Sequence, residues 1–343
     1  MAAEPITILG LLEDTAKPER SAVSLTSIKA IAAGGNHTLI LSEDGLVESY
    51  GDSSHGQYVS DDLDETRSPE QRQWAYPHRV AQVSATWTSS VLLHHDGTLS
   101  TCGEGLSGEL GLGVTTTHAP QTCSIPDFPP HGTVVVHIAS CMAHTVAVLS
   151  NGEVWGWGRG RQGQLGEPAE IVWSPRRVEG LPFPAVKAVC GKDFTCIVGG
   201  RGEGRILIVG LKRNDRFNLV SSAPSEVPGW KNVAASWGGI YVLSEDGVLL
   251  GFGRNDHGQL PPIGLPPVEA IAAGSEHCLA LTKAGKVLAW GWGEHGNCGA
   301  PTGSDGGTNG LWTEIEVPRP VKAVFAGCAT SFVISKTHHE PDE

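Results

Sequence analysis

The sequence contains neither a long run of hydrophobic residues nor a segment rich in lysine and arginine. A transmembrane helix needs about 18 or more mostly apolar residues, and a secretory signal needs a charged leader before an apolar stretch. We therefore expect a soluble, cytoplasmic protein, with the nucleus as a second location. The net charge of −13 argues against direct binding to nucleic acid or to an anionic membrane, because both require a basic face.

Recognisable motifs of catalysis and metal binding are also missing. The sequence has no G-x-S-x-G, no Walker loop, no protein-kinase set and no HExxH. Its 8 cysteines form no CxxC pair and are expected to be buried, reduced thiols. The sequence therefore predicts a protein that is not an enzyme and that has no cofactor and no metal site.

Three G-x-G-x-x-G sequences, which begin at Gly103, Gly158 and Gly291, invite a dinucleotide-binding interpretation. In such a site the glycines open a helix whose N-terminus faces a pyrophosphate. No helical pattern follows any of the three, and all three occupy equivalent repeat positions. They are interpreted as turn glycines.

Glycine, in contrast, is abundant, with 45 residues, and it recurs at fixed spacings. In each copy a second glycine follows the first by six residues and a third follows by eleven. The complete copies are Gly45/Gly51/Gly56, Gly97/Gly103/Gly108, Gly152/Gly158/Gly163, Gly247/Gly253/Gly258 and Gly285/Gly291/Gly296. Another copy keeps Gly204 and Gly210, with Asp215 at the third place. Periods of a few tens of residues indicate stacked structural repeats.

One copy, residues 31–58, illustrates the repeat. A short apolar run, Thr38–Leu41, leads to Asp44-Gly45, and a second run follows over Leu46–Tyr50. Asp-Gly suits the positive φ of a tight hairpin turn. No stretch is long and periodic enough for a core helix, so each repeat predicts a β-meander.

The two ends of the chain carry complementary halves of a further copy. Val321–Ile334 reads as the upstream half, and Ile6–Gly10 reads like Leu46–Gly51. A ring whose last sheet is completed by the first strand avoids exposed sheet edges. The sequence thus predicts an all-β, seven-bladed β-propeller over residues 1–335, closed by the N-terminal strand in the C-terminal blade. Residues 336–343 are predicted to be a disordered polar tail.

Two segments carry a family resemblance: residues 155–166 (WGWGRGRQGQLG) and 33–39 (AGGNHTL). They resemble the regulator-of-chromosome-condensation (RCC-type) repeat, and the similarity extends from Ile6 to Ile334. The resemblance implies a seven-bladed propeller closed by shared strands. It also implies that His37, His144 and His277 are structural and bond within their own blades, rather than binding metal.

A candidate partner site follows from one repeat position, the residue after the small glycine of A-G-x-x-H. Around the chain it is Gly35, Trp87, Met142, Lys192, Trp237, Ser275 and Cys328. These residues precede the strand that begins at the histidine position, so we expect them at one rim. Tryptophan and methionine favour interface cores, although Trp87 and Trp237 could instead fold back onto their blades. The predicted partner-binding residues are Trp87, Met142, Lys192, Asp193, Trp237 and Glu276.

Within the family, the short acidic ring without appendages resembles the fungal killer-toxin-insensitivity, or alpha-tubulin-suppressor, group. That resemblance implies a scaffold that forms a heterodimer with, and regulates, a small zinc-binding electron carrier of diphthamide biosynthesis on elongation factor two. It also implies support for Elongator-dependent modification of tRNA wobble uridines, with Elongator components as further partners.

Two alternatives within the family stay open. The first is guanine-nucleotide exchange on a Ran-type small GTPase, although the founding member uses a basic tail and here Met1–Pro5 leads straight into the first strand. The second is a tryptophan-based light sensor with the motif G-W-R-H-T. This chain has tryptophan at two of the seven equivalent places, and no arginine follows either one.

Overall fold

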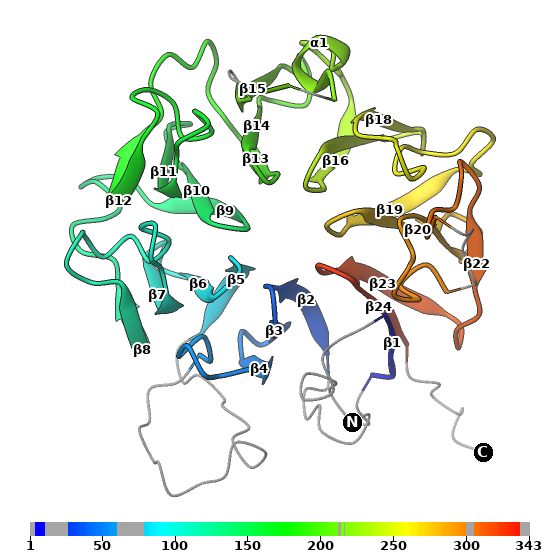
Figure 1. The fold of residues 1–343 in the computed structure, drawn as a ribbon, viewed down its shortest axis with the longest axis horizontal. Helices are drawn as coiled ribbons and strands as arrows, with labels where there is room; N and C mark the ends of the chain where they lie inside the picture. Colours follow the sequence, from blue (N-terminus) through cyan, green and yellow to red (C-terminus); the bar gives the residue numbers. More distant parts are fainter. Residues whose placement is uncertain are drawn as a thin grey trace, which may run out of the picture.

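The computed structural model of the protein describes residues 4–10, 27–59, 79–211, 214–215, 217–299 and 305–336. Seven separate antiparallel sheets surround a common centre (Figure 1). The predicted all-β, seven-bladed propeller is therefore confirmed. Over the described ranges, no helix has the length and apolar character needed to cross a membrane.

Each blade is a meander that begins with its innermost strand. Blade 1 contains β2 (Ile28–Ala33), β3 (His37–Ser42) and β4 (Val47–Gly51). Blade 2 contains β5 (Val80–Ala85), β6 (Ser89–His94), β7 (Leu99–Glu104) and β8 (His118–Ser124). Blade 3 contains β9 (Val135–Cys141), β10 (His144–Leu149), β11 (Val154–Arg159) and β12 (Ile171–Arg177).

The second half of the ring follows the same plan. Blade 4 contains β13 (Lys187–Cys190), β14 (Phe194–Val198) and β15 (Ile206–Gly210). Blade 5 contains β16 (Trp230–Ala235), β17 (Gly239–Ser244) and β18 (Leu249–Gly253). Blade 6 contains β19 (Val268–Ala273), β20 (His277–Thr282), β21 (Val287–Gly291) and β22 (Thr313–Ile315). Blade 7 contains β23 (Val321–Ala326), β24 (Thr330–Ser335) and β1 (Ile6–Gly10).

Glycine is needed at the first two places of the repeated spacing for different reasons. Gly45 has a φ of 82° in the hairpin between β3 and β4, a conformation that Asp-Gly turns favour. Gly51 has a φ of 104°, and a Cβ there would lie 2.3 Å from the carbonyl oxygen of Asn36. The second glycine thus allows the third strand to end against the backbone of the preceding turn.

Three of the segments that connect successive repeats contribute outer strands. These strands are β8, β12 and β22, which pair with the third strands of blades 2, 3 and 6. The segment between blades 4 and 5 holds the short helix α1 (Leu219–Ser222). Asp215, at the place of the missing third glycine, accepts the backbone N–H groups of Leu219 and Val220 at 2.7 and 2.9 Å. Short strands form there because the third strand of each blade offers an unpaired edge.

The N-terminal strand completes the C-terminal blade. β1 pairs antiparallel with β24, from Ile6 opposite Ile334 to Gly10 opposite Thr330. Glu4 adds a link to the first blade: its carboxylate accepts the N–H of Ile28 at 2.9 Å and pairs with Lys322 at 3.0 Å. The predicted polar tail lies outside the described residues except for Lys336, and its disorder stays a prediction.

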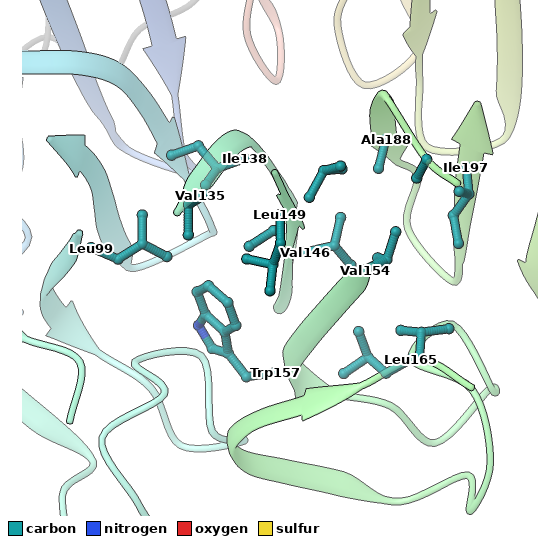
Figure 2. Close-up of a cluster of buried hydrophobic side chains, with 14 of the residues drawn as sticks. Leu99, Val135, Ile138, Val146, Leu149, Val154, Trp157, Leu165, Ala188 and Ile197 are labelled. Atoms are coloured by element: carbon teal, nitrogen blue, oxygen red, sulfur yellow. The ribbon is translucent and has the colours of Figure 1, made fainter. Parts of the chain in front are cut away.

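The hydrophobic core lies between the blades. Its largest cluster joins blades 2, 3 and 4 and contains the fully buried Trp157 among aliphatic side chains such as Leu99 and Val146 (Figure 2). Because both faces of a blade are covered by its neighbours, the second strands are apolar on both faces, and β3 and β10 are buried along their whole length. The rigidity of the ring therefore depends on contacts between repeats.

A hydrogen bond between blades recurs at five interfaces in the described part of the chain. The acceptor is the backbone carbonyl of the residue after the third glycine, and the donor is a side chain of the next blade. The donor–acceptor pairs are Ser90–Gln57 (2.6 Å), Trp157–Glu109 (3.0 Å), Thr195–Gln164 (2.8 Å), Trp290–Gln259 (3.0 Å) and Ser331–Asn297 (2.7 Å). All five acceptor residues are buried, so losing a donor is costly where no other side chain replaces it; the carbonyl of Gln259 also accepts from the hydroxyl of Tyr241 at 3.0 Å.

The three repeat histidines bond to the next blade, which corrects the expectation that they bond within their own. Their Nε2 atoms lie close to hydroxyl oxygens across the interface: His37 to Ser90 (3.1 Å), His144 to Thr195 (3.2 Å) and His277 to Ser331 (2.9 Å). Because each hydroxyl donates its proton to a carbonyl, the histidine Nε2–H must be the donor. Burial lowers the pKa of all three to about 4, so the rings are neutral at pH 7.

Deleting Met1–Gly10 should destabilise the whole ring. The deletion removes β1, exposes the outer edge of β24 and breaks the Glu4–Lys322 pair. Loss of the Ile6 and Ile8 contacts alone should cost about 3 kcal/mol of unfolding free energy. We expect a lower melting temperature by calorimetry, with removal of residues 337–343 as the control. An unchanged melting temperature for the N-terminal deletion would contradict the pairing.

Stability should fall as the pH is lowered from 6.5 towards 4. In this range the unfolded chain protonates its histidines while the buried His37, His144 and His277 stay neutral, so the unfolded state binds more protons. Each buried histidine should add about 1 kcal/mol per pH unit to the slope. Carboxylates with lowered pKa, such as Asp52 and Asp256, lose their contribution only at lower pH.

His277→Gln tests this assignment, because the glutamine amide can still donate to Ser331. We expect a shallower pH dependence of the urea unfolding free energy between pH 6.5 and 4.5, with a residual slope from the remaining histidines. An identical slope in the wild-type chain and the variant would show that His277 is not protonated on unfolding in this range.

Candidate functional site

The predicted rim positions do lie side by side around the centre of one face. Each lies in the turn from the inner strand to the second strand, and at five of the seven positions its backbone N–H donates to the carbonyl of the same position in the next blade. The pairs are Gly35–Trp87 (2.9 Å), Trp87–Met142 (2.7 Å), Lys192–Trp237 (3.0 Å), Trp237–Ser275 (2.9 Å) and Ser275–Cys328 (3.3 Å). We call this set the rim ring.

The loops that follow the third strands lie on the same face. In five blades, the residue after the second glycine of the repeated spacing donates its N–H to the carbonyl of the residue that follows the rim position in the same blade. The pairs are Asp52–Asn36 (2.9 Å), Glu104–Thr88 (2.9 Å), Arg159–Ala143 (2.7 Å), Arg254–Gly238 (2.9 Å) and Trp292–Glu276 (2.9 Å). The rim ring and these loops therefore form one continuous surface.

A central channel opens inside the rim ring. Its cavity of about 180 Å³ is lined by small residues at the ends of the inner strands, including Ala33, Ala85, Ala235, Ala273 and Ala326. Small side chains are required because seven strands converge there and larger ones would collide. The channel is thus narrow, and the hydroxyl groups of Ser84, Ser140 and Ser236 add polar groups to its wall.

Trp87 and Trp237 meet over this channel. They come from blades 2 and 5, on opposite sides of the ring (Figure 1), and their ring centroids are 6.3 Å apart at an angle of 41°. Neither ring folds back onto its own blade; Trp87 instead covers Gly35 of blade 1, where a Cβ would lie 2.5 Å from the indole. Trp87 nevertheless remains 42% exposed, which leaves a large aromatic surface open to solvent.

The other predicted site residues differ in their exposure to solvent and in their contacts. Lys192 is exposed and holds its Nζ 5.1 Å from the centroid of the Trp237 ring, a cation–π contact. Met142 is partly buried in the rim ring. Asp193 is partly buried too, and its Oδ1 atom has no hydrogen-bond partner among the described residues.

The side chain of Glu276 is buried in a hydrogen-bonded network and is not exposed on the surface. It is 6% exposed, pairs with Arg254 and accepts a hydrogen bond from Gln259 at 3.1 Å. Burial raises the pKa of Glu276 although the Arg254 guanidinium opposes the shift. Arg254 also pairs with Asp256 at 2.6 Å. This network holds the loop of blade 5 against blade 6.

Sequence reasoning missed a groove beside the tryptophan pair. This space of about 410 Å³ is bounded by Trp87, Trp237, Glu276 and Trp292, with Asn297 also in its wall. Trp292 stacks on His257 with centroids 5.0 Å apart and planes at 12°. Asn297 is 1% exposed, and within the described part of the chain its side-chain Oδ1 has no hydrogen-bond partner. Trp292 could have been found, because it occupies the repeat place held by charged residues in blades 1, 2, 3 and 5.

The thiols of the channel are held in their protonated form. Burial raises the pKa of Cys190 to about 12 and of Cys328 to about 11, and it raises that of Cys141 further. All 8 cysteines are free, and 5 are buried. Across the described ranges, no cluster of three or more His, Cys, Asp or Glu side chains has a metal-binding arrangement.

The chain is similar to known proteins over almost its whole length. The chain is 28% identical to an RCC1 repeat-containing protein of Schizosaccharomyces pombe, over 92% of this chain and 91% of that protein. It is also 28% identical to the mouse secretion-regulating guanine nucleotide exchange factor, over 93% of this chain and 78% of the relative. The structure of Prp20p from Saccharomyces cerevisiae superposes with a TM-score of 0.78 at 19% identity, covering 98% of this chain and 93% of Prp20p.

The family itself is identified by a match over almost the whole ring. The model of the RCC1-like domain matches residues 6–333, from β1 to within β24. This range includes the repeated glycine spacing, the rim ring and the strands of all seven blades. The chain belongs to the RCC1-like domain family.

Proposed function

We propose that this protein is a non-catalytic scaffold that binds a protein partner at the mouth of its central channel. The observation that carries the proposal is the Trp87–Trp237 pair, with 42% of Trp87 exposed and Lys192 beside it. Exposed tryptophans bury much area at little entropic cost when a partner covers them, and they often dominate binding energy.

The surroundings of the pair favour binding over chemistry. The rim ring fixes both tryptophans through backbone hydrogen bonds, so little ordering entropy remains to be lost on association. The nearby histidines and cysteines are neutral at pH 7 because burial shifts their pKa values away from neutrality. These groups are therefore suited to a structural role and not to proton or group transfer.

For the partner, we propose the small zinc-binding electron carrier of diphthamide biosynthesis, bound as a heterodimer. The proposal is supported by the resemblance of the compact acidic ring to the killer-toxin-insensitivity group. In this role the scaffold would regulate the carrier in diphthamide synthesis on elongation factor two and in Elongator-dependent modification of tRNA wobble uridines. The contact would be formed by the predicted site residues Trp87, Met142, Lys192, Asp193 and Trp237. Glu276 would stabilise this surface through its ion pair with Arg254.

Trp237→Ala tests the partner face. We expect this change to weaken binding of the purified zinc carrier by about 2 kcal/mol, roughly 30-fold in Kd, as measured by isothermal titration calorimetry. Trp312→Ala is the matched control, because Trp312 is 37% exposed and does not line the channel or the groove. A Kd for Trp237→Ala within error of the wild-type value would remove the tryptophan pair from the interface.

A second candidate function is nucleotide exchange on a Ran-type GTPase. Two comparisons favour it: the mouse relative is named as a guanine nucleotide exchange factor, and the Prp20p structure is described together with binding to Gsp1p and histones. Release of a fluorescent GDP analogue from Ran distinguishes the candidates. If this chain acts only as a scaffold, release should proceed at the intrinsic rate; a clear acceleration would replace the first proposal with the second.

A further inference from the structure

The charges on the channel-mouth face are unevenly distributed among the blades. Two positions can be compared in each segment that follows a third strand on this face, the first and the third residue after the second glycine of the repeated spacing. They are Asp52 and Ser54 in blade 1, Glu104 and Leu106 in blade 2, Arg159 and Arg161 in blade 3, Arg254 and Asp256 in blade 5, and Trp292 and Glu294 in blade 6. Among these described loops, only that of blade 3 carries two cations.

Arg159 and Arg161 are exposed and form no ion pair with a described carboxylate, and Glu109 is a carboxylate on which the charge of Arg159 acts. Among the described residues, no acidic side chain lies within ion-pair distance of either guanidinium or of Lys192. Arg254, in contrast, is neutralised by Asp256 and Glu276. On a chain with a net charge of −13, these three cations gather in neighbouring blades, with Asp193 as the acidic neighbour of Lys192.

These three cations adjoin the tryptophan pair. The N–H of Arg159 donates to Ala143, the residue after Met142, and Lys192 donates its N–H to Trp237. The charges of Asp193 and Lys192 both act on Cys141, which precedes Met142, so the rim turns of blades 3 and 4 are close neighbours. A basic strip over blades 3 and 4 therefore leads to the exposed indole of Trp87.

We propose that this strip binds an acidic segment of the protein partner. Carboxylates of the segment pair with Arg159, Arg161 and Lys192, and one apolar side chain of the same segment packs on the Trp87–Trp237 pair. Arginine suits this role because its guanidinium binds a carboxylate through two hydrogen bonds. The inference rests on the proposed function, since it names the chemistry of the partner at the same mouth.

An acidic protein segment fits this strip better than a nucleic acid. Nucleic-acid affinity grows with the number of phosphates neutralised, and three cations supply few such contacts. The net charge of −13 would also repel a polyanion that extends beyond the strip. A short acidic segment avoids this repulsion because its charge ends where the cations end.

The test uses the purified full chain and short fluorescein-labelled probes. The first probe is a peptide of alternating Glu and Asp around one central Phe, and the second is the same peptide with Lys at the acidic places. Anisotropy should show binding of the acidic peptide alone, weakening as sodium chloride is raised from about 50 to about 300 mM. The double variant Arg159→Glu/Arg161→Glu should bind the acidic peptide at least about tenfold more weakly.

The matched control is Arg201→Glu/Lys283→Glu, which makes the same change in net charge at the hairpin turns of blades 4 and 6, at the far ends of their second strands. This variant should bind the acidic peptide like the wild-type chain. Equal binding by the Arg159→Glu/Arg161→Glu variant and the control would overturn the proposal. Failure of the acidic peptide to bind the wild-type chain would overturn it as well.

A labelled oligothymidylate forms the third arm. Binding of this probe with loss in Arg159→Glu/Arg161→Glu, and no binding of the acidic peptide, would assign the strip to phosphate and overturn the proposal. Calorimetry with the zinc carrier distinguishes failure of the proposed scaffold function from failure of the proposed acidic segment. Weaker binding by Trp237→Ala but unchanged binding by Arg159→Glu/Arg161→Glu would leave the scaffold standing and refute the acidic segment.

Discussion

The hydrogen bond from one blade to the main-chain carbonyl of the blade before it is the interaction on which the rest of the structure depends. It places a serine, threonine or tryptophan donor against a buried residue such as Gln57 or Gln164, where water cannot replace it. The acceptor side chains also tie their own loops: Gln57 and Gln164 each accept a backbone N–H at 2.9 Å. One short motif thus shapes a loop and sets the position of the next sheet.

That fixed spacing determines what the channel mouth can present. With the blades held in register, the rim turns meet closely enough for backbone hydrogen bonds, and the inner strands have room only for small side chains. Two large indoles are accommodated because they lie over the opening and not within it. Their exposure is therefore a consequence of the ring geometry as much as of their own sequence positions.

The sequence predicted what is encoded locally and missed what depends on distant partners. The Asp-Gly turns and the matching of Ile6–Gly10 with Val321–Ile334 specified the meander and its pairing. The outer strand β8 was missed because it is only defined by the free edge of β7. The partner of His37 was predicted in the wrong blade because Ser90 is 53 positions away in another repeat. The burial of Glu276, a predicted partner-binding residue, could not be predicted because it depends on Arg254 from blade 5.

The pairing of β1 with β24 has a consequence for biosynthesis. β1 is synthesised before the other strands of the ring and finds its sheet partner only after β24 has been made, because its register runs from Ile334 to Thr330. Until then the growing chain carries an unpaired apolar strand and an incomplete set of blades, which is a state prone to aggregation. β1 is therefore the segment that a chaperone would have to shield until β24 pairs with it.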